Sequence, residues 1–308
     1  MEIPPWLWVA FTIGACATQT ARNAMQRHLT ERLGTIGATH VRFLFGLPFG
    51  LLFLLLTWAV VGLDGLRLSG AYAGWALAGA VAQIAGTALM LAAMRERSFV
   101  VATAYLKTEP VQIALFGLVV LGDRLSAQSS LAVLIATAGV LLMSMPARAQ
   151  TTGPAQPAPG GFDRLRPAIY GIASGAMFAL SAVGFRGAIL ELGDAPFYVR
   201  ATTTLATSLA MQTTLLTTWL LLRSPKVLGE IFRAWRPSLA AGAAGAFASQ
   251  MWFLAFSLQA AAAVRTVGLL ELLFAQAASR KLFSQRLSRR EAAGILMMVG
   301  GLVMLLTG

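Results

Sequence analysis

The sequence predicts an all-α membrane protein with ten transmembrane helices in two inverted five-helix repeats, and three observations support this fold class. Of the 308 residues, 57% are hydrophobic and only 12% are charged, whereas soluble domains are roughly a quarter charged. Long apolar segments follow one another along the whole chain, whose mean hydropathy is +0.71. Short landmarks of the first half also recur in the second half.

Each apolar segment is interpreted as one membrane-spanning helix. A bilayer core needs about 20 helical residues, and the shortest segments can still cross if flanking side chains snorkel to the interface. The segments lack the two-residue alternation of barrel strands, so helices are the remaining spanning structure. The ten segments are residues 6–24, 39–62, 71–94, 100–121, 126–145, 168–190, 197–222, 237–258, 261–279 and 292–307.

The N-terminus and the overall charge narrow the class further. The chain begins MEIPPWLWVAF, without the basic region and cleavage site of a signal peptide, so we expect the first helix to be retained. Cys16 is the single cysteine, which excludes an intramolecular disulfide. A net charge of +12 would suggest nucleic acid binding by a soluble protein. In a membrane protein the position of the charges matters more, and we predict no nucleic-acid partner.

The basic residues are concentrated on one side of the predicted membrane, with 18 on that side and 4 on the other. The positive-inside rule places the basic side in the cytoplasm and both termini outside. We expect the membrane to be the bacterial cytoplasmic (inner) membrane. The 18 residues are Arg22, Arg27, Arg32, Arg42, Arg95, Arg97, Arg148, Arg164, Arg166, Arg223, Lys226, Arg233, Arg236, Arg280, Lys281, Arg286, Arg289 and Arg290; the four are Arg67, Arg124, Arg186 and Arg200.

A linker is predicted between the two halves. The stretch ARAQTTGPAQPAPGGF is rich in Pro, Gly, Ala and Gln and has no apolar period, which is typical of flexible connections. We therefore divide the chain into a first repeat, residues 1–146, a linker, residues 147–165, and a second repeat, residues 166–308.

The halves resemble each other at an offset of 162 residues. This offset places Glu109 on Glu271, the RLS at 124–126 on the RLS at 286–288, and Gly139 on Gly301. Because five is an odd number, the second half enters the membrane in the opposite sense. Inverted repeats of this kind place a binding site near the midplane, at their interface.

The run from residue 100 to 143, with TEP, LGDRLS and ATAGVLLM, resembles the end of an EamA-type repeat of the drug/metabolite transporter superfamily. The second half has its own version, GLLELLFAQAASRKLFSQRLS followed by AAGILMMVGGLVMLL. The chain departs from the pattern at Asp123 and Gln285, where family members often have Glu, and at Leu272, which follows Glu271 in place of a proline. The family is generally drawn with both termini in the cytoplasm, opposite to the orientation that the charges predict.

Glu109 and Glu271 are the acidic residues expected at the centre of the membrane. The other ten of the twelve acidic residues fall in loops or at helix ends. An ionised carboxylate at the bilayer centre costs at least about 2.5 to 3.5 kcal/mol, so it must face protein or water, pair with a cation, or be protonated. We predict that both acids bind substrate or couple protons. A structural carboxyl at a helix end or a buried hydroxyl is the alternative.

Neighbours of Glu109 extend the predicted site. Tyr105 and Gln112 share its helical face, and a mixed aromatic and amide stripe suits a cavity wall better than lipid. Pro110 cannot donate the hydrogen bond to the Leu106 carbonyl, which predicts a helix kink.

Two basic residues lie within the predicted helices and are expected near their ends. Lys107 lies about 200° around the helix from Glu109, so these two cannot pair within it. We expect Lys107 to snorkel toward the loop that holds Arg95 and Arg97, although contact with substrate is the alternative. Arg265 lies four positions into its segment, and we expect an edge role for it as well.

Amide and aromatic side chains on other helices complete the prediction. Gln19 belongs to a polar face of the first helix, with Thr12, Asn23 and Gln26, which predicts a water-lined vestibule or a helix end that frays into water. The resemblance implies that the third and eighth helices border the central cavity, which adds three candidate contacts. These are Gln83, Gln250 and Trp252.

The sequence contains no signature of an enzyme. HExxH, GxSxG and Walker motifs are absent, and His28 and His40 are the only histidines. We predict no metal site, no cofactor and no catalytic residues.

The predicted function is a secondary transporter that exports a small organic solute by alternating access, with protons as a candidate coupling ion. Amino acids, amines and amphipathic metabolites or drugs fit the central acids. An anionic substrate is disfavoured, because it would require central Lys or Arg. A polytopic membrane enzyme acting on a lipid-linked substrate, and a lipid-flipping or accessory subunit, are the alternatives.

Overall fold

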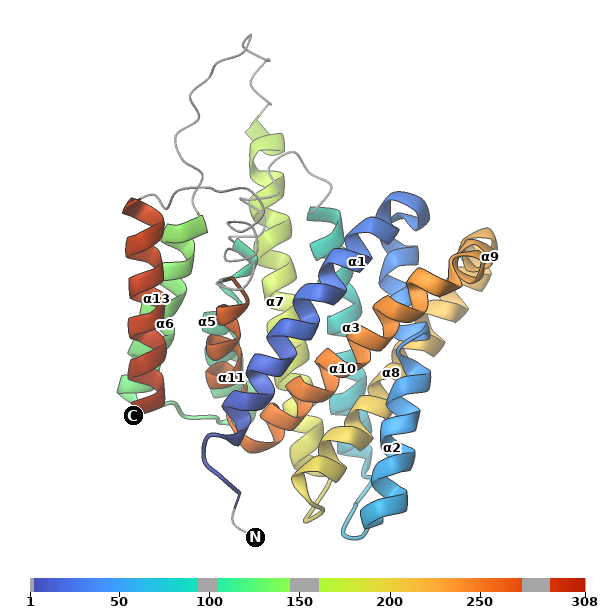
Figure 1. Ribbon diagram of the computed structural model, residues 1–308, viewed down its shortest axis with the longest axis horizontal. Coiled ribbons are helices and arrows are strands. Elements are labelled where there is room, and N and C mark those ends of the chain that lie inside the picture. Colours follow the sequence, from blue (N-terminus) through green and yellow to red (C-terminus); the bar gives the residue numbers. More distant parts are fainter. Residues whose placement is uncertain (1–2, 94–104, 145–160, 273–288, 308) are drawn as a thin grey trace.

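The computed structural model describes residues 3–93, 105–144, 161–272 and 289–307, and all regular elements in these ranges are helices (Figure 1). They are α1 (Leu7–Leu44), α2 (Leu47–Val61), α3 (Gly70–Ala93), α5 (Glu109–Phe116) with a π-helical turn (Gly117–Leu121), α6 (Ala127–Ser144), α7 (Gly161–Glu191), α8 (Phe197–Arg223), α9 (Pro225–Arg233), α10 (Trp235–Leu258), α11 (Ala261–Val267) with a 3₁₀ turn (Gly268–Leu270), and α13 (Arg289–Thr307).

Six helical stretches are long and apolar enough to cross a membrane, within the ranges given above. Three shorter apolar helices accompany them, at Glu109–Leu121, Ala127–Met143 and Ala261–Leu270. The six stretches are His28–Val61, Gly70–Ala93, Ala168–Glu191, Phe197–Arg223, Trp235–Leu258 and Arg289–Thr307.

The chain reverses direction inside α1. Gly34 has φ 69° and ψ 176°, a conformation that is essentially restricted to glycine. Residues on either side of Gly34 are helical, so α1 contains the predicted first helix and the start of the predicted second one, which continues into α2 (Figure 1). The first helix therefore extends beyond residue 24, where the hydropathy pattern predicted its end.

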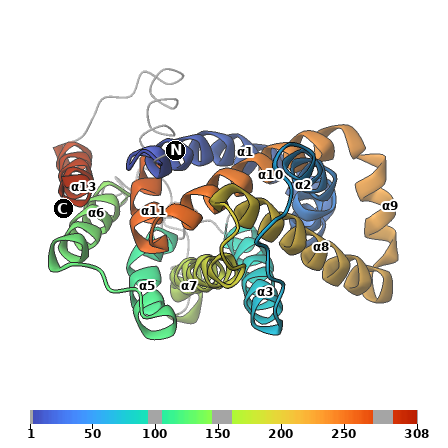
Figure 2. The ribbon, with the colours of Figure 1, turned by 90° about the horizontal axis from the view of Figure 1, so that it is seen from below.

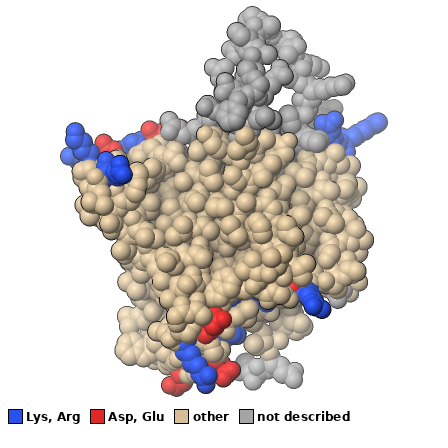
Figure 3. Space-filling model, turned by 180° about the vertical axis from the view of Figure 1, so that it is seen from behind, with Lys and Arg blue, Asp and Glu red and all other residues tan. Residues whose placement is uncertain are grey.

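The surface of the helix bundle is apolar between two charged ends. Leu51, Leu55, Trp58 and Val60 on α2 are exposed, and a soluble protein rarely exposes contiguous apolar surface of this kind. Figure 3 shows Lys, Arg, Asp and Glu near the two ends of the molecule, with a wide uncharged band between them. This arrangement fits a bilayer around the bundle.

Helices from the two halves of the chain pack against each other (Figures 1 and 2). α1 packs on α10, α3 on α7, α6 on α13, α2 on α8, and α5 crosses α11. Small residues permit the closest approaches. A Cβ atom on Gly184 would lie 2.9 Å from the Cα of Gly79, and one on Gly139 would lie 2.6 Å from the carbonyl oxygen of Gly294.

Both termini lie at the same end of the helices (Figure 1). α7 begins at Gly161, so the last residues of the predicted linker are helical, and residues 147–160 lie outside the described part. The loop with Arg95 and Arg97, residues 273–279 of the ninth segment, Gln285 and the RLS at 286–288 lie outside it as well.

Candidate functional site

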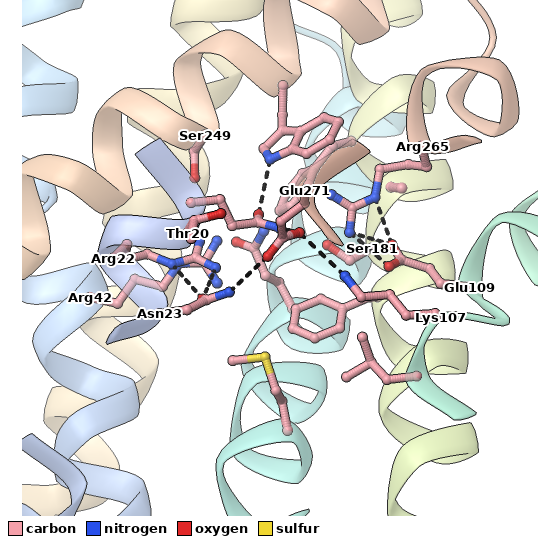
Figure 4. A pocket seen from close by; sticks show the side chains of 18 of the residues that line it. Thr20, Arg22, Asn23, Arg42, Lys107, Glu109, Ser181, Ser249, Arg265 and Glu271 are labelled. Atoms are coloured by element: carbon pink, nitrogen blue, oxygen red, sulfur yellow. Dashed lines mark hydrogen bonds and ion pairs between the residues drawn. The ribbon is translucent and has the colours of Figure 1, made fainter. Parts of the chain in front are cut away.

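A cavity of about 250 Å³ lies in the middle of the bundle. Residues from α1, α3, α7, α10, α11 and the segment around Glu109 line it (Figure 4). The polar and charged lining residues are Gln19, Thr20, Arg22, Asn23, Arg42, Gln83, Lys107, Glu109, Ser181, Ser249, Arg265 and Glu271. The apolar ones are Met90, Ala93, Leu106, Phe178, Ala182, Phe185, Trp252, Phe253, Phe256 and Leu272.

A break in the helix positions Glu109 at the cavity. The helical pattern is interrupted at Lys107 and Thr108, and α5 starts at Glu109 with Pro110 in its first turn. Proline is favoured there because the first amide groups of a helix have no intrahelical acceptor. The Thr108 hydroxyl donates a 2.7 Å hydrogen bond to the Tyr105 carbonyl across the break.

Glu109 forms a bidentate ion pair with Arg265 of α11. Nε and an Nη atom of Arg265 donate hydrogen bonds of 2.8 Å to the two carboxylate oxygens. Glu109 is 5% exposed, and paired geometry of this kind is the strongest form of arginine–carboxylate contact. The Arg265 guanidinium also lies 4.3 Å from the centre of the Trp252 ring, a cation–π contact.

Glu271 forms the second ion pair, with Lys107, at 3.3 Å. Its carboxylate also accepts hydrogen bonds from Gln19 (2.9 Å) and Asn23 (3.3 Å) of α1. The indole nitrogen of Trp252 donates a 3.0 Å hydrogen bond to the Gln19 carbonyl oxygen. Since Trp252 also contacts Arg265, one continuous network joins the two ion pairs (Figure 4).

Arg22 and Arg42 line the same cavity without a carboxylate partner among the described residues. They are 2% and 4% exposed. Arg22 donates two hydrogen bonds to the Asn23 side-chain oxygen, at 2.7 and 3.2 Å, and Arg42 donates one to the Thr87 hydroxyl at 3.1 Å. Two uncompensated positive charges therefore remain beside the two ion pairs.

A second cluster joins helices at the end of the cavity nearer the termini. Arg186 of α7 pairs with Asp123 at 3.0 Å and donates 2.7 Å hydrogen bonds to the carbonyl oxygens of Phe256 and Gln259. Phe185, the neighbour of Arg186, and Phe256 both line the cavity. This termini-side clasp ties α7 to the end of α10 and to the turn after the π-helix.

The structure brings five of the eight predicted contact residues to the cavity, namely Glu109, Glu271, Gln19, Gln83 and Trp252. The other three have different surroundings. Tyr105 is 38% exposed, Gln112 donates to the Thr108 hydroxyl at 2.9 Å, and Gln250 donates to the Thr202 hydroxyl at 2.9 Å. Their contact with substrate stays a prediction, and the cavity lining does not include them.

Three expectations about basic residues are wrong. Lys107 and Arg265 were expected at helix edges, but each forms an ion pair inside the cavity. Arg42 was counted at a helix edge, but it is buried in the cavity wall. The physical reason is the same each time: a partner or a polar cavity supplied by another helix holds the charge at depth. Because basic side chains do line the cavity, a lack of central Lys and Arg no longer disfavours an anionic substrate.

Sequence reasoning assigned no binding role to Arg22 or Arg42, although both carry a signal. Arg22 is three residues from Gln19 and therefore on the same side of the first helix. Arg42 lies in an apolar run, between the buried Val41 and Phe43. A charge in a membrane helix is by itself a candidate functional residue. Ser181 and Ser249, which are small hydroxyls on apolar helices, carry no such signal.

Comparisons with known proteins support the membrane-transporter fold. Residues 6–145 match the profile of the EamA-like transporter family. One solved structure, described as "Crystal structure of protein", superimposes with a TM-score of 0.66 over 97% of this chain and 96% of its own, at 16% sequence identity. At that identity the likeness shows a shared fold alone. No curated protein matches the chain. The first half of the chain, residues 6–145, is therefore similar to the EamA-like transporter family.

Proposed function

We propose that the protein is a secondary exporter of a small organic solute, built from ten spans in two inverted repeats that alternate access to the central cavity. The pattern of helix packing supports the repeat. At an offset of 162 residues, α1 corresponds to α7 and α3 to α10, so the packing of α1 on α10 and of α7 on α3 is the same contact made twice. The pairs α2 with α8 and α6 with α13 each join a helix to its own counterpart.

Close contacts at glycines also recur between positions that correspond at the 162-residue offset. Gly139 corresponds to Gly301, and Ala132 corresponds to Gly294. A Cβ on Gly139 would lie 2.6 Å from the Gly294 carbonyl oxygen, and a Cβ on Gly301 would lie 2.8 Å from the Ala132 carbonyl oxygen. This reciprocity is expected of a pseudo-twofold axis between the halves.

The observation that carries the function is the pair of ionic contacts across the central cavity. Lys107 and Glu109 come from the first half, and Glu271 and Arg265 from the second, so each ion pair joins one half to the other. Alternating access requires the halves to move against each other. Such motion changes these contacts. A solute or proton that binds a member of either pair would therefore be coupled to the motion.

The membrane orientation in this proposal follows the basic residues. α9 is a short helix at the end of the bundle opposite the termini (Figure 1). It buries Leu228 and Ile231 and carries Lys226 and Arg233, as expected of an interfacial helix at an anionic cytoplasmic surface. We therefore place α9 in the cytoplasm and both termini on the opposite side of the inner membrane.

Transport by the purified protein in proteoliposomes tests the proposal. Uptake of amino acids, amines and amphipathic carboxylates would be measured with and without an imposed pH gradient, in both gradient directions. We expect Glu109→Gln and Glu271→Gln to abolish transport, while Glu230→Gln, a change of an exposed carboxylate on α9, leaves it unchanged. Unchanged uptake in both cavity variants would contradict the site. Binding without transport would favour an accessory role, and a cytoplasmic signal from a reporter at the C-terminus would contradict the orientation.

A further inference from the structure

We propose that Arg22 and Arg42 form an oxyanion subsite, and that the transported solute is a small amphipathic organic anion or zwitterion whose acidic group binds there. The inference rests on the proposed transport function and names the substrate class of the same cavity. It departs from the expectation, based on the central carboxylates, that an anionic substrate is disfavoured.

The charge balance of the cavity is the first observation. Glu109 and Glu271 are each paired with a cation of the opposite half, so the carboxylates are already neutralised. Among the described residues of the lining, Arg22 and Arg42 are the remaining charged ones. A buried charge without a counter-charge is strongly unfavourable, and a bound anion would supply two guanidinium groups with the missing partner.

The hydrogen bonds of the two arginines leave donors free. One Nη atom of Arg22 is fully buried and has no hydrogen-bond partner within the part of the chain that the structure describes. Arg42 uses one of its donors, toward the Thr87 hydroxyl, and a guanidinium has five. Free, buried N–H groups on a planar fork match the geometry of a carboxylate or phosphate.

The two side chains lie side by side. A Cβ on Gly245 of α10 would lie 3.3 Å from the Arg42 Cγ and 3.4 Å from the Arg22 Cδ, so this glycine leaves room for both stems. Figure 4 shows Arg22 and Arg42 together at one side of the cavity, with the pair of Arg265 and Glu109 at the other side. One acidic group can therefore reach both guanidinium groups.

The apolar part of the solute is assigned to an aromatic wall on α7 and α10. Phe185 and Phe253 have ring centres 4.7 Å apart, and Phe256 continues the row at 6.4 Å from Phe253. All three line the cavity. The cavity volume of about 250 Å³ favours a small metabolite, since pockets for drug-sized ligands measure roughly 300 to 1,000 Å³.

The experiment measures binding of one matched probe series to the full-length protein in detergent by isothermal titration calorimetry. The probes share a phenylethyl body and differ in the head group: 3-phenylpropanoate, phenethyl phosphate, 3-phenylpropanamide and 3-phenylpropylamine. We expect at least one of the two oxyanions to bind about tenfold or more tightly than the amide and the amine. A preference between carboxylate and phosphate identifies the acidic group.

Variants locate the subsite. Arg22→Gln and Arg42→Gln should each weaken oxyanion binding by about tenfold or more and leave amide binding unchanged. The matched control is Arg233→Gln, a change at an exposed arginine of α9. If a cavity variant does not fold, the probe series on the unmodified protein still tests whether the cavity prefers an oxyanion. Amide or amine binding equal to oxyanion binding, or no oxyanion binding, overturns the inference.

The outcomes separate this inference from the proposed function. Oxyanion binding in detergent without transport in proteoliposomes would retain the subsite and overturn the transport proposal. Transport of amines or neutral solutes by a protein that does not bind the oxyanions would retain transport and overturn the subsite.

Discussion

Arg265 and Glu109 form a two-pronged ion pair between the halves of the chain, with both hydrogen bonds at 2.8 Å. The pair lies beside a cavity inside an apolar bundle, where an unpaired charge is costly. Loss of one partner alone would therefore leave an unpaired buried charge, and this effect on stability can be separated from the effect on transport by mutation.

Neutralising one partner of this pair should destabilise the protein more than neutralising both. Arg265→Gln leaves the carboxylate of Glu109 without its cation, and loss of one partner of a buried pair costs about 3–5 kcal/mol. The double variant Arg265→Gln/Glu109→Gln replaces the ion pair by two amides and should regain most of that stability while transport stays lost. Thermal unfolding in detergent measures the effect. A double variant as unstable as the sum of the single variants would contradict the coupling.

Trp252→Phe should lower the free energy of unfolding slightly, and Trp252→Ala should lower it more. Phenylalanine keeps a ring beneath the Arg265 guanidinium but loses the 3.0 Å hydrogen bond to Gln19, which is worth about 1 kcal/mol. Alanine also removes the ring and leaves a hole beside Gly268, whose Cβ position lies 2.7 Å from the indole. We expect losses of about 1 kcal/mol and about 3–5 kcal/mol respectively. Equal losses in unfolding experiments would show that the hydrogen bond carries the role of the side chain.

Weakening the termini-side clasp should open the cavity toward the side of the termini. Asp123→Asn removes the charge that pairs with Arg186. In a background in which Cys16, the single cysteine, is replaced by serine, Ser181→Cys provides a reporter in the cavity. A membrane-impermeant maleimide added on the side of the termini should label it faster in the Asp123→Asn variant. Asp64→Asn, at an exposed position, is the control, and equal labelling in both variants would exclude a gating role.

Two glycines of neighbouring helices should respond in opposite ways to alanine. A Cβ on Gly139 of α6 would lie 2.6 Å from backbone atoms of Gly294 and Met298, whereas one on Gly300 of α13 would meet nothing within 4 Å. Gly139→Ala should cost about 1–3 kcal/mol because the helices must separate. Gly300→Ala should be neutral or stabilise the helix by up to about 1 kcal/mol. Thermal unfolding distinguishes them, and a neutral Gly139→Ala would contradict the close packing of α6 and α13.

Much of the fold could be predicted because apolar segments of about 20 residues indicate helices that span a membrane. The all-helical class and the membrane setting follow from hydropathy, and the family match confirms the resemblance. The turn at Gly34 could not be placed, because the polar residues around it resemble a loop. In the structure Gln26 donates a hydrogen bond to the Ala38 carbonyl, and this contact between the two arms of α1 lets the first helix continue past its apolar part.

The acidic residues of the candidate site could be proposed from the sequence, because a carboxylate stands out in an apolar segment. A carboxylate in an apolar run is rare enough that Glu109 and Glu271 could be chosen as candidates without coordinates, and both line the cavity. The cations could not, because the depth of a long basic side chain depends on which partner lies within its reach. Lys107 pairs with Glu271, which lies 164 residues further along the chain. No local sequence pattern predicts a contact between residues so far apart.

The two ion pairs do not repeat between the halves of the chain. At the 162-residue offset the acids Glu109 and Glu271 correspond, but Lys107 corresponds to Leu269 and Arg265 to Thr103. Each half therefore supplies an acid at the same position and a cation at a different one. Two copies of either half would then bring identical carboxylates together without the complete set of counter-ions. The present chain depends on both of its unequal halves.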